Sequence, residues 1–161
     1  VDKHGATALI VAAQEGHAAC VSALLGAGAE VEATNQDGDT SLTVAAFAGR
    51  EACVSLLLAA GAEVEAKDAL GDTALMQAAY KGRLECVSIL LAAGAEVEAT
   101  SQEGSTALML AAQEGAGAVV SALLVAGGEV EATSNNGNTA LMLAAQNGHS
   151  ACVSALLAAG A

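Results

Sequence analysis

The chain has 161 residues, enough for one domain with a sizeable core, and its 54% hydrophobic and 14% charged residues do not describe a disordered chain. Acidic residues outnumber basic ones 18 to 5, and a surface with a net charge of -13 repels phosphate backbones and anionic lipid. Glycine or glutamate interrupts every apolar run before it reaches the roughly 18 residues of a membrane-spanning helix. We therefore expect neither nucleic acid nor a membrane as a partner.

Four sets of residues recur every 33 positions, and this period organises the whole chain. Near the start of each unit come a glycine and a threonine: Gly5, Gly38, Gly71, Gly104, Gly137 and Thr7, Thr40, Thr73, Thr106, Thr139. Two further glycine sets keep the same step: Gly16, Gly49, Gly82, Gly115, Gly148 and Gly28, Gly61, Gly94, Gly127, Gly160. A fixed period of this length is the signature of a solenoid, with repeats at approximately 2–34, 35–67, 68–100, 101–133 and 134–161.

In the first unit the pattern predicts two short helices followed by a turn. Thr7 is suited to cap the first helix, because its hydroxyl can accept an unpaired backbone N–H, and Gly16 can end that helix in a left-handed conformation. A second helix, ended by Gly28, carries an apolar face of Cys20, Val21, Leu24 and Leu25. Residues 30–38 are polar and turn-like. So short a unit cannot bury its apolar face alone, so we expect the five units to stack as one domain, residues 1–161.

The period and the local motifs together resemble the ankyrin repeat. The matching segments of the first unit are Asp2-Lys3-His4-Gly5-Ala6-Thr7-Ala8-Leu9-Ile10, Ala12-Ala13, Gly16-His17, Val21, Leu24-Leu25 and Gly28-Ala29-Glu30-Val31-Glu32-Ala33. The resemblance covers the whole chain and implies an all-α solenoid of helix-turn-helix units joined by β-hairpin-like fingers. It also implies a concave face, formed by the fingers and first helices, that binds protein partners.

The chain departs from the family pattern at two positions of each unit. The usual proline is replaced by Ala8, Ser41, Ala74, Ala107 and Ala140, and the usual histidine by Ile10, Thr43, Met76, Met109 and Met142. Proline is tolerated but not required in a first helical turn, so its loss costs little. The second change exchanges a polar contact between repeats for apolar packing.

Candidate reactive groups do not assemble into a recognisable catalytic, cofactor or metal site. His17 and Cys20, like His149 and Cys152, lie three residues apart on a helix, but a structural zinc site usually takes four ligands. A Cys–His nucleophile lacks a third residue to orient the histidine. We therefore expect no enzymatic activity, no cofactor and no metal, and we interpret both histidines as structural residues at a helix start.

The remaining cysteines and glutamates also have structural interpretations. Cys20, Cys53, Cys86 and Cys152 share one register in which Val119 fills the fourth slot, so the register is an apolar packing position. Helices packed about 8–10 Å apart are too distant for disulfides. Free buried thiols fit an intracellular protein, cytoplasmic if it is natural. The pairs Glu30/Glu32, Glu63/Glu65, Glu96/Glu98 and Glu129/Glu131 predict a solvated acidic ridge in preference to calcium sites.

Unevenly distributed side chains mark the predicted partner site in the second and third units. One column reads Gln14, Phe47, Tyr80, Gln113, Gln146, so both aromatic residues of the chain fall in adjacent repeats. We expect Phe47, Leu70 and Tyr80 to supply apolar anchors. Lys81, together with Arg50 or Arg83, is expected to attract an acidic partner. The alternative is that the aromatics only cover alanine-rich helix surface.

Two interpretations of function remain at this point. A protein-protein interaction module that binds through its concave face is favoured by the extended groove of a solenoid. The near identity of the repeats also fits a designed or consensus scaffold with no native partner. Because Leu156 and Leu157 repeat the interior pattern of Leu24 and Leu25 without a polar terminal unit, we further expect fraying or end-to-end self-association.

Overall fold

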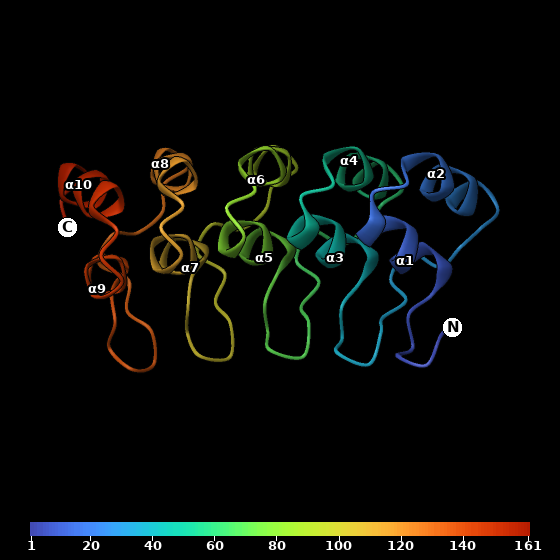
Figure 1. Cartoon of the computed structure of the whole chain (residues 1–161), viewed down its shortest axis with the longest axis horizontal. Coiled ribbons are helices and arrows are strands. Elements are labelled where there is room, and N and C mark those ends of the chain that lie inside the picture. The colour runs from blue at the N-terminus through green and yellow to red at the C-terminus, as the bar shows by residue number, and fades with distance from the viewer.

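The computed structural model describes all 161 residues. It contains ten α-helices arranged in five pairs. The first helices of the units are α1 (Ala8–Glu15), α3 (Ser41–Ala48), α5 (Ala74–Tyr80), α7 (Ala107–Gln113) and α9 (Ala140–Gln146). The second helices are α2 (Ala18–Gly26), α4 (Glu51–Ala59), α6 (Leu84–Ala92), α8 (Gly117–Val125) and α10 (Ser150–Ala158). They form two rows, and the loops between units project as fingers beyond the first helices (Figure 1). The predicted all-α solenoid is confirmed.

Every first helix begins after the recurring threonine. In the first unit the backbone N–H of Ile10 donates to Thr7 Oγ1 at 3.2 Å, and the same bond recurs in each of the other units. These caps satisfy a donor that the first turn of a helix leaves unpaired. Gly16 ends α1 with a φ of 81°, as predicted from its position. The helix boundaries are thus set by residues local to each unit.

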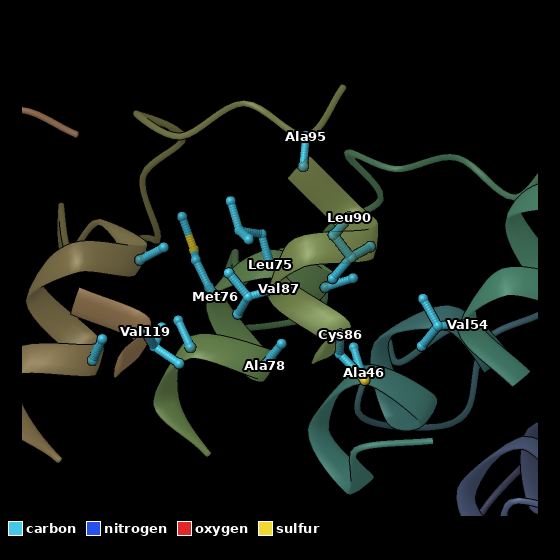
Figure 2. Packing of buried hydrophobic residues seen from close by; sticks show 14 of the residues in the cluster. Ala46, Val54, Leu75, Met76, Ala78, Cys86, Val87, Leu90, Ala95 and Val119 are labelled. Atoms are coloured by element: carbon cyan, nitrogen blue, oxygen red, sulfur yellow. The ribbon is translucent and has the colours of Figure 1, made fainter. Parts of the chain in front are cut away.

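The apolar faces of neighbouring units form one continuous cluster of 32 buried residues. Figure 2 shows its centre, where Leu75 and Met76 of α5 lie near Val87 of α6, and Cys86 of α6 lies near Ala46 of α3. Each of these side chains is at most 1% exposed. Burial of one such side chain contributes about 1.5–3 kcal/mol to stability. Met109 is also 1% exposed, so the methionine that replaces the family histidine is a core residue in the third and fourth units.

The cysteine register is confirmed as an apolar packing position, with one exception. All four thiols are free; Cys53, Cys86 and Cys152 are buried, and Val119 is buried in the same register. Cys20 is exposed, so the prediction that it is buried was wrong. The later second helices α4, α6, α8 and α10 each contact the second helix of the preceding unit, and α2 has no such neighbour.

The fingers are closed turns, and the chain contains no β-strand. In the second finger the N–H of Asn35 donates to the carbonyl of Asp39 at 3.1 Å, and the N–H of Gly38 donates back to Asn35. These bonds close one turn without extending into a ladder, so the hairpin-like detail of the prediction is not confirmed. Gly38 has a φ of 80°, and a Cβ there would lie 2.8 Å from the backbone nitrogen of Ala69. Only glycine fits this contact between fingers.

Successive fingers are joined at their tips by backbone hydrogen bonds. Gln36 N donates to His4 O at 3.0 Å, and Ala69 N donates to Asp37 O at 2.9 Å. The same step continues from Gln102 N to Leu70 O at 2.9 Å and from Asn135 N to Glu103 O at 3.0 Å. These bonds hold the finger side chains of adjacent units next to one another, and they therefore define the surface that the fingers present.

Candidate functional site

A groove of about 610 Å³ runs between the fingers and the first helices of the first three units. Its apolar lining includes Val11, Val44, Phe47 and Leu70, and its acidic lining consists of Asp2, Asp37, Asp39 and Asp68. Its lining residues come from the fingers and from the first helices α1, α3 and α5. The structure thus brings together two of the predicted anchors, Phe47 and Leu70. The groove also includes residues of the first unit, whereas the predicted site was confined to the second and third units.

The two anchors are held by different elements. Phe47 lies in the last turn of α3 and is 41% exposed. Leu70 lies at the tip of the third finger and is 66% exposed. Its N–H donates to Asp68 Oδ1 at 2.8 Å and its carbonyl accepts from Gln102 N at 2.9 Å, so its backbone is fixed on both sides. Both side chains are exposed in part, and both line the groove.

The carboxylates of the groove crowd one another. Burial raises the pKa of Asp39, and the negative charges of Asp68 and Asp37 raise it further. Asp72 lies outside the groove lining, and burial raises its pKa to about 6, with added repulsion from Asp68 and Glu103. Asp68 itself is well satisfied, since it accepts from two backbone N–H groups and from Gln77 Nε2 at 2.8 Å. The groove is therefore a region of concentrated negative charge.

Lys81 lies between the two aromatic rings at the edge of the predicted site. Its Nζ is 4.7 Å from the ring centroid of Phe47 and 4.8 Å from that of Tyr80. Such cation–π contacts contribute about 0.5–1 kcal/mol at exposed positions. Phe47, Tyr80 and Lys81 thus form one cluster, of which only Phe47 lines the groove.

Arg50 and Arg83, which the sequence predicts to attract a partner, also join neighbouring units. Arg50 Nε donates to the carbonyl of Gln14 at 3.0 Å, and Arg83 Nε donates to the carbonyl of Phe47 at 3.3 Å. His149 occupies the same column, and its Nε2 lies 2.9 Å from the carbonyl of Gln113. His17 and His149 also precede α2 and α10, as their interpretation as residues of a helix start requires. Neither arginine lines the groove.

The second glutamates of the first three acidic pairs have a role that sequence reasoning missed. Glu32 Oε1 accepts from the N–H of Glu63 at 3.0 Å, and the same bond recurs from Glu65 to Glu96 and from Glu98 to Glu129, both at 2.9 Å. The first glutamates are exposed, as a solvated ridge requires. Identical second glutamates in four units were the available signal, but the bond they make reaches into the next repeat.

Metal ligands and nucleophilic thiols were the reactive groups that the sequence offered. No group of three or more His, Cys, Asp or Glu side chains is placed to hold a metal ion. Burial raises the pKa of the Cys53 and Cys152 thiols, and raises that of Cys86 to about 11, which disfavours the nucleophilic thiolate. No helix has the length and apolar character needed to cross a bilayer.

Comparison with known proteins agrees with the architecture. A family model described as ankyrin repeats in three copies matches residues 1–68 and 75–161. No curated protein matches the chain. The family model covers nearly the whole sequence, and the stacked helix pairs, recurring threonine caps and projecting fingers are those that the resemblance implied. The chain belongs to the ankyrin repeat family.

Proposed function

We propose that this protein binds another protein, without catalysis, through the groove between the fingers and first helices of its first three units. Ankyrin repeats are in general protein-protein interaction modules. The observation that carries the proposal is the exposure of Phe47 and Leu70 in one groove. The same columns hold glutamine or polar residues in most other units, so the fold does not demand an apolar side chain at either position.

Tyr80 and Lys81 extend this site at its edge, since both contact each other and Lys81 also contacts Phe47. Arg50 and Arg83 lie outside it because their side chains are used between repeats. A few side chains that fill well-packed, fully desolvated pockets carry most of the binding energy of a protein interface. We therefore assign the anchoring role to Phe47 and Leu70.

A random-sequence peptide library displayed on phage and selected on the immobilised chain tests the proposal. The double variant Phe47→Gln plus Leu70→Asn places residues of the array's own columns, Gln14 and Asn136, at both anchors. We expect the selected peptides to bind this variant at least about tenfold more weakly, as truncation of two hot spots of more than 1 kcal/mol each implies.

The matched control is Val125→Ala, which removes an apolar side chain that is 90% exposed on α8. Other units carry alanine in that column, so the change is also consistent with the fold. Binding that survives loss of both anchors, with circular dichroism unchanged, contradicts the proposed site. A selection that enriches no peptide favours the second interpretation, a consensus scaffold without a native partner, which the near identity of the repeats supports.

The ends of the array favour self-association as an additional property of the 161-residue chain. Met142 is 56% exposed, whereas its equivalents Met76 and Met109 are 1% exposed against the following unit. Exposed Cys20 at the other end likewise corresponds to buried positions in the interior. A second copy stacked head to tail would cover both faces. Sedimentation velocity over a concentration series tests this, and a monomer at all concentrations contradicts it.

The free buried thiols also agree with a cytoplasmic location.

A further inference from the structure

We propose, on the basis of the binding function above, that the groove selects a cationic partner segment. Such a segment presents an aliphatic or aromatic side chain to Phe47 and Leu70 and places a lysine or arginine against Asp37 and Asp39. This partner has the opposite charge to the one expected from the sequence, and the reason lies in how the structure distributes its few basic residues.

The groove contains four aspartates and no lysine or arginine. The basic residues of the neighbouring units are used elsewhere: Arg50 and Arg83 donate to carbonyls of preceding units, and Lys67 Nζ donates to the carbonyl of Thr100 at 2.9 Å. Lys81 lies over the rings of Phe47 and Tyr80, outside the groove lining. The one histidine of the lining is His4. An acidic ligand would therefore meet uncompensated repulsion in the groove.

Two of the four carboxylates are available to a ligand. Asp68 is occupied by three donors of its own unit, and Asp2 Oδ1 accepts from the N–H groups of His4 and Ala6. Asp37 is exposed, and no donor of the chain engages its carboxylate. Asp39 receives one side-chain bond, from Asn35 Nδ2 at 3.1 Å. A guanidinium or ammonium between Asp37 and Asp39 would offset the repulsion among these neighbouring carboxylates.

The charged and apolar halves of the groove lie side by side. The carbonyl of Asp37 accepts from Ala69 N at 2.9 Å, which places the tip of the second finger against the tip that carries Leu70. Val44 and Phe47 of α3 line the same groove. An extended segment can therefore contact Leu70 or Phe47 with one side chain and Asp37 with a nearby one.

Other occupants fit the groove less well. A second copy of this chain carries a net charge of -13 and would bring further negative charge to an acidic groove. A divalent cation would require a cluster of donor side chains that the chain does not form. A segment with basic and apolar residues close in sequence satisfies both halves of the site.

The test continues the selection from the random-sequence peptide library. We expect the enriched peptides to contain more lysine and arginine near an apolar residue than the unselected library does. Affinity of one enriched peptide should fall as sodium chloride is raised, because rim charges are screened. Asp37→Asn plus Asp39→Asn, which introduces the residue found at Asn136 and Asn138, should weaken that peptide roughly tenfold, at two- to fivefold for each exposed ion pair.

The matched control is Glu63→Gln plus Glu96→Gln. It removes the same charge from the second and third units at exposed carboxylates that do not line the groove. Control affinity within about twofold of the wild type, together with the loss above, supports the inference. Equal losses in both variants would show a nonspecific charge effect and overturn it.

Failure of this inference is distinguishable from failure of the proposed function. Peptides that depend on Phe47 and Leu70 but lack basic residues, or that ignore the Asp37 and Asp39 substitutions, overturn the inference and leave the binding site in place. Enriched peptides that are insensitive to the anchor variant, or no enrichment at all, overturn the proposed function and this inference with it.

Discussion

The hydroxyl of Ser41 is buried at the start of α3 and has no hydrogen-bond partner. Ser41 is 0% exposed, and the equivalent residues Ala74, Ala107 and Ala140 are each 1% exposed. Alanine therefore fits this environment in three other units of the same array. We predict that Ser41→Ala stabilises the protein, because it removes an unpaired polar atom from a buried position and keeps the β-carbon in place.

The expected gain follows from the burial of that oxygen. An unsatisfied buried polar group costs about 1–3 kcal/mol. The difference in helix propensity between serine and alanine adds at most about 0.5 kcal/mol, and less at a first helical position than in a helix interior. We expect the free energy of unfolding to rise by about 1–2 kcal/mol. For a domain of this size that corresponds to an increase in Tm of about 3–6 °C.

Urea denaturation followed by circular dichroism and scanning calorimetry measure this difference. Ser55→Ala is the matched control, because Ser55 is exposed in the interior of α4 and reports the change in helix propensity alone. An unchanged urea m-value would show that the compactness of the folded and unfolded states is unaltered. A gain no larger than that of the control, or a loss of stability, would refute the reasoning that the Ser41 hydroxyl is unpaired.

Three further predictions concern other features of the array. Ala116→Arg should add the bond that Arg50 and Arg83 make, here from Nε to the carbonyl of Tyr80, with the side chain packed against Gly82. This bond should raise the free energy of unfolding by about 0.5–1 kcal/mol. Ala116→Met lacks the donor and should leave the free energy of unfolding unchanged. Thiol counting with a disulfide reagent should find one fast-reacting thiol in the native state, the exposed Cys20, and a Cys20→Ser variant that retains a fast phase would contradict this. Burial raises the folded-state pKa of Asp72 to about 6 from an ordinary 3.8, so the folded state binds this proton more tightly than the unfolded state does. The stabilisation that comes from the bound proton is present below about pH 4 and is lost as the pH rises through about 6. Asp72→Asn should therefore raise the stability at pH 7 by about 1 kcal/mol, allowing for solvent screening of a half-exposed group, and flatten the pH dependence of Tm between pH 4 and pH 7; an unchanged slope would show that the pKa is not raised.

The candidate site could be predicted only in part. The uneven column containing Phe47 and Tyr80 pointed to the second and third units, and Leu70 stands out as an apolar residue at a finger tip. The role of Arg50 could not be predicted from its own unit, because its partner is a carbonyl 36 residues away in the preceding repeat. The charge of the groove likewise depends on which basic side chains the array uses internally.

The sequence by itself determined the repeat and its internal architecture. Caps such as Thr7, helix-ending glycines such as Gly16 and the 33-residue period act within a unit, through bonds between residues a few positions apart. Only the tertiary structure decided what each column faces, because the same residue type is buried or exposed according to its neighbours. Met76 is 1% exposed and Met142 is 56% exposed, although both follow the same threonine and alanine-leucine sequence. Packing of one unit on the next, through contacts about a repeat apart in sequence, makes that difference, and it also leaves Phe47 and Leu70 open in the groove.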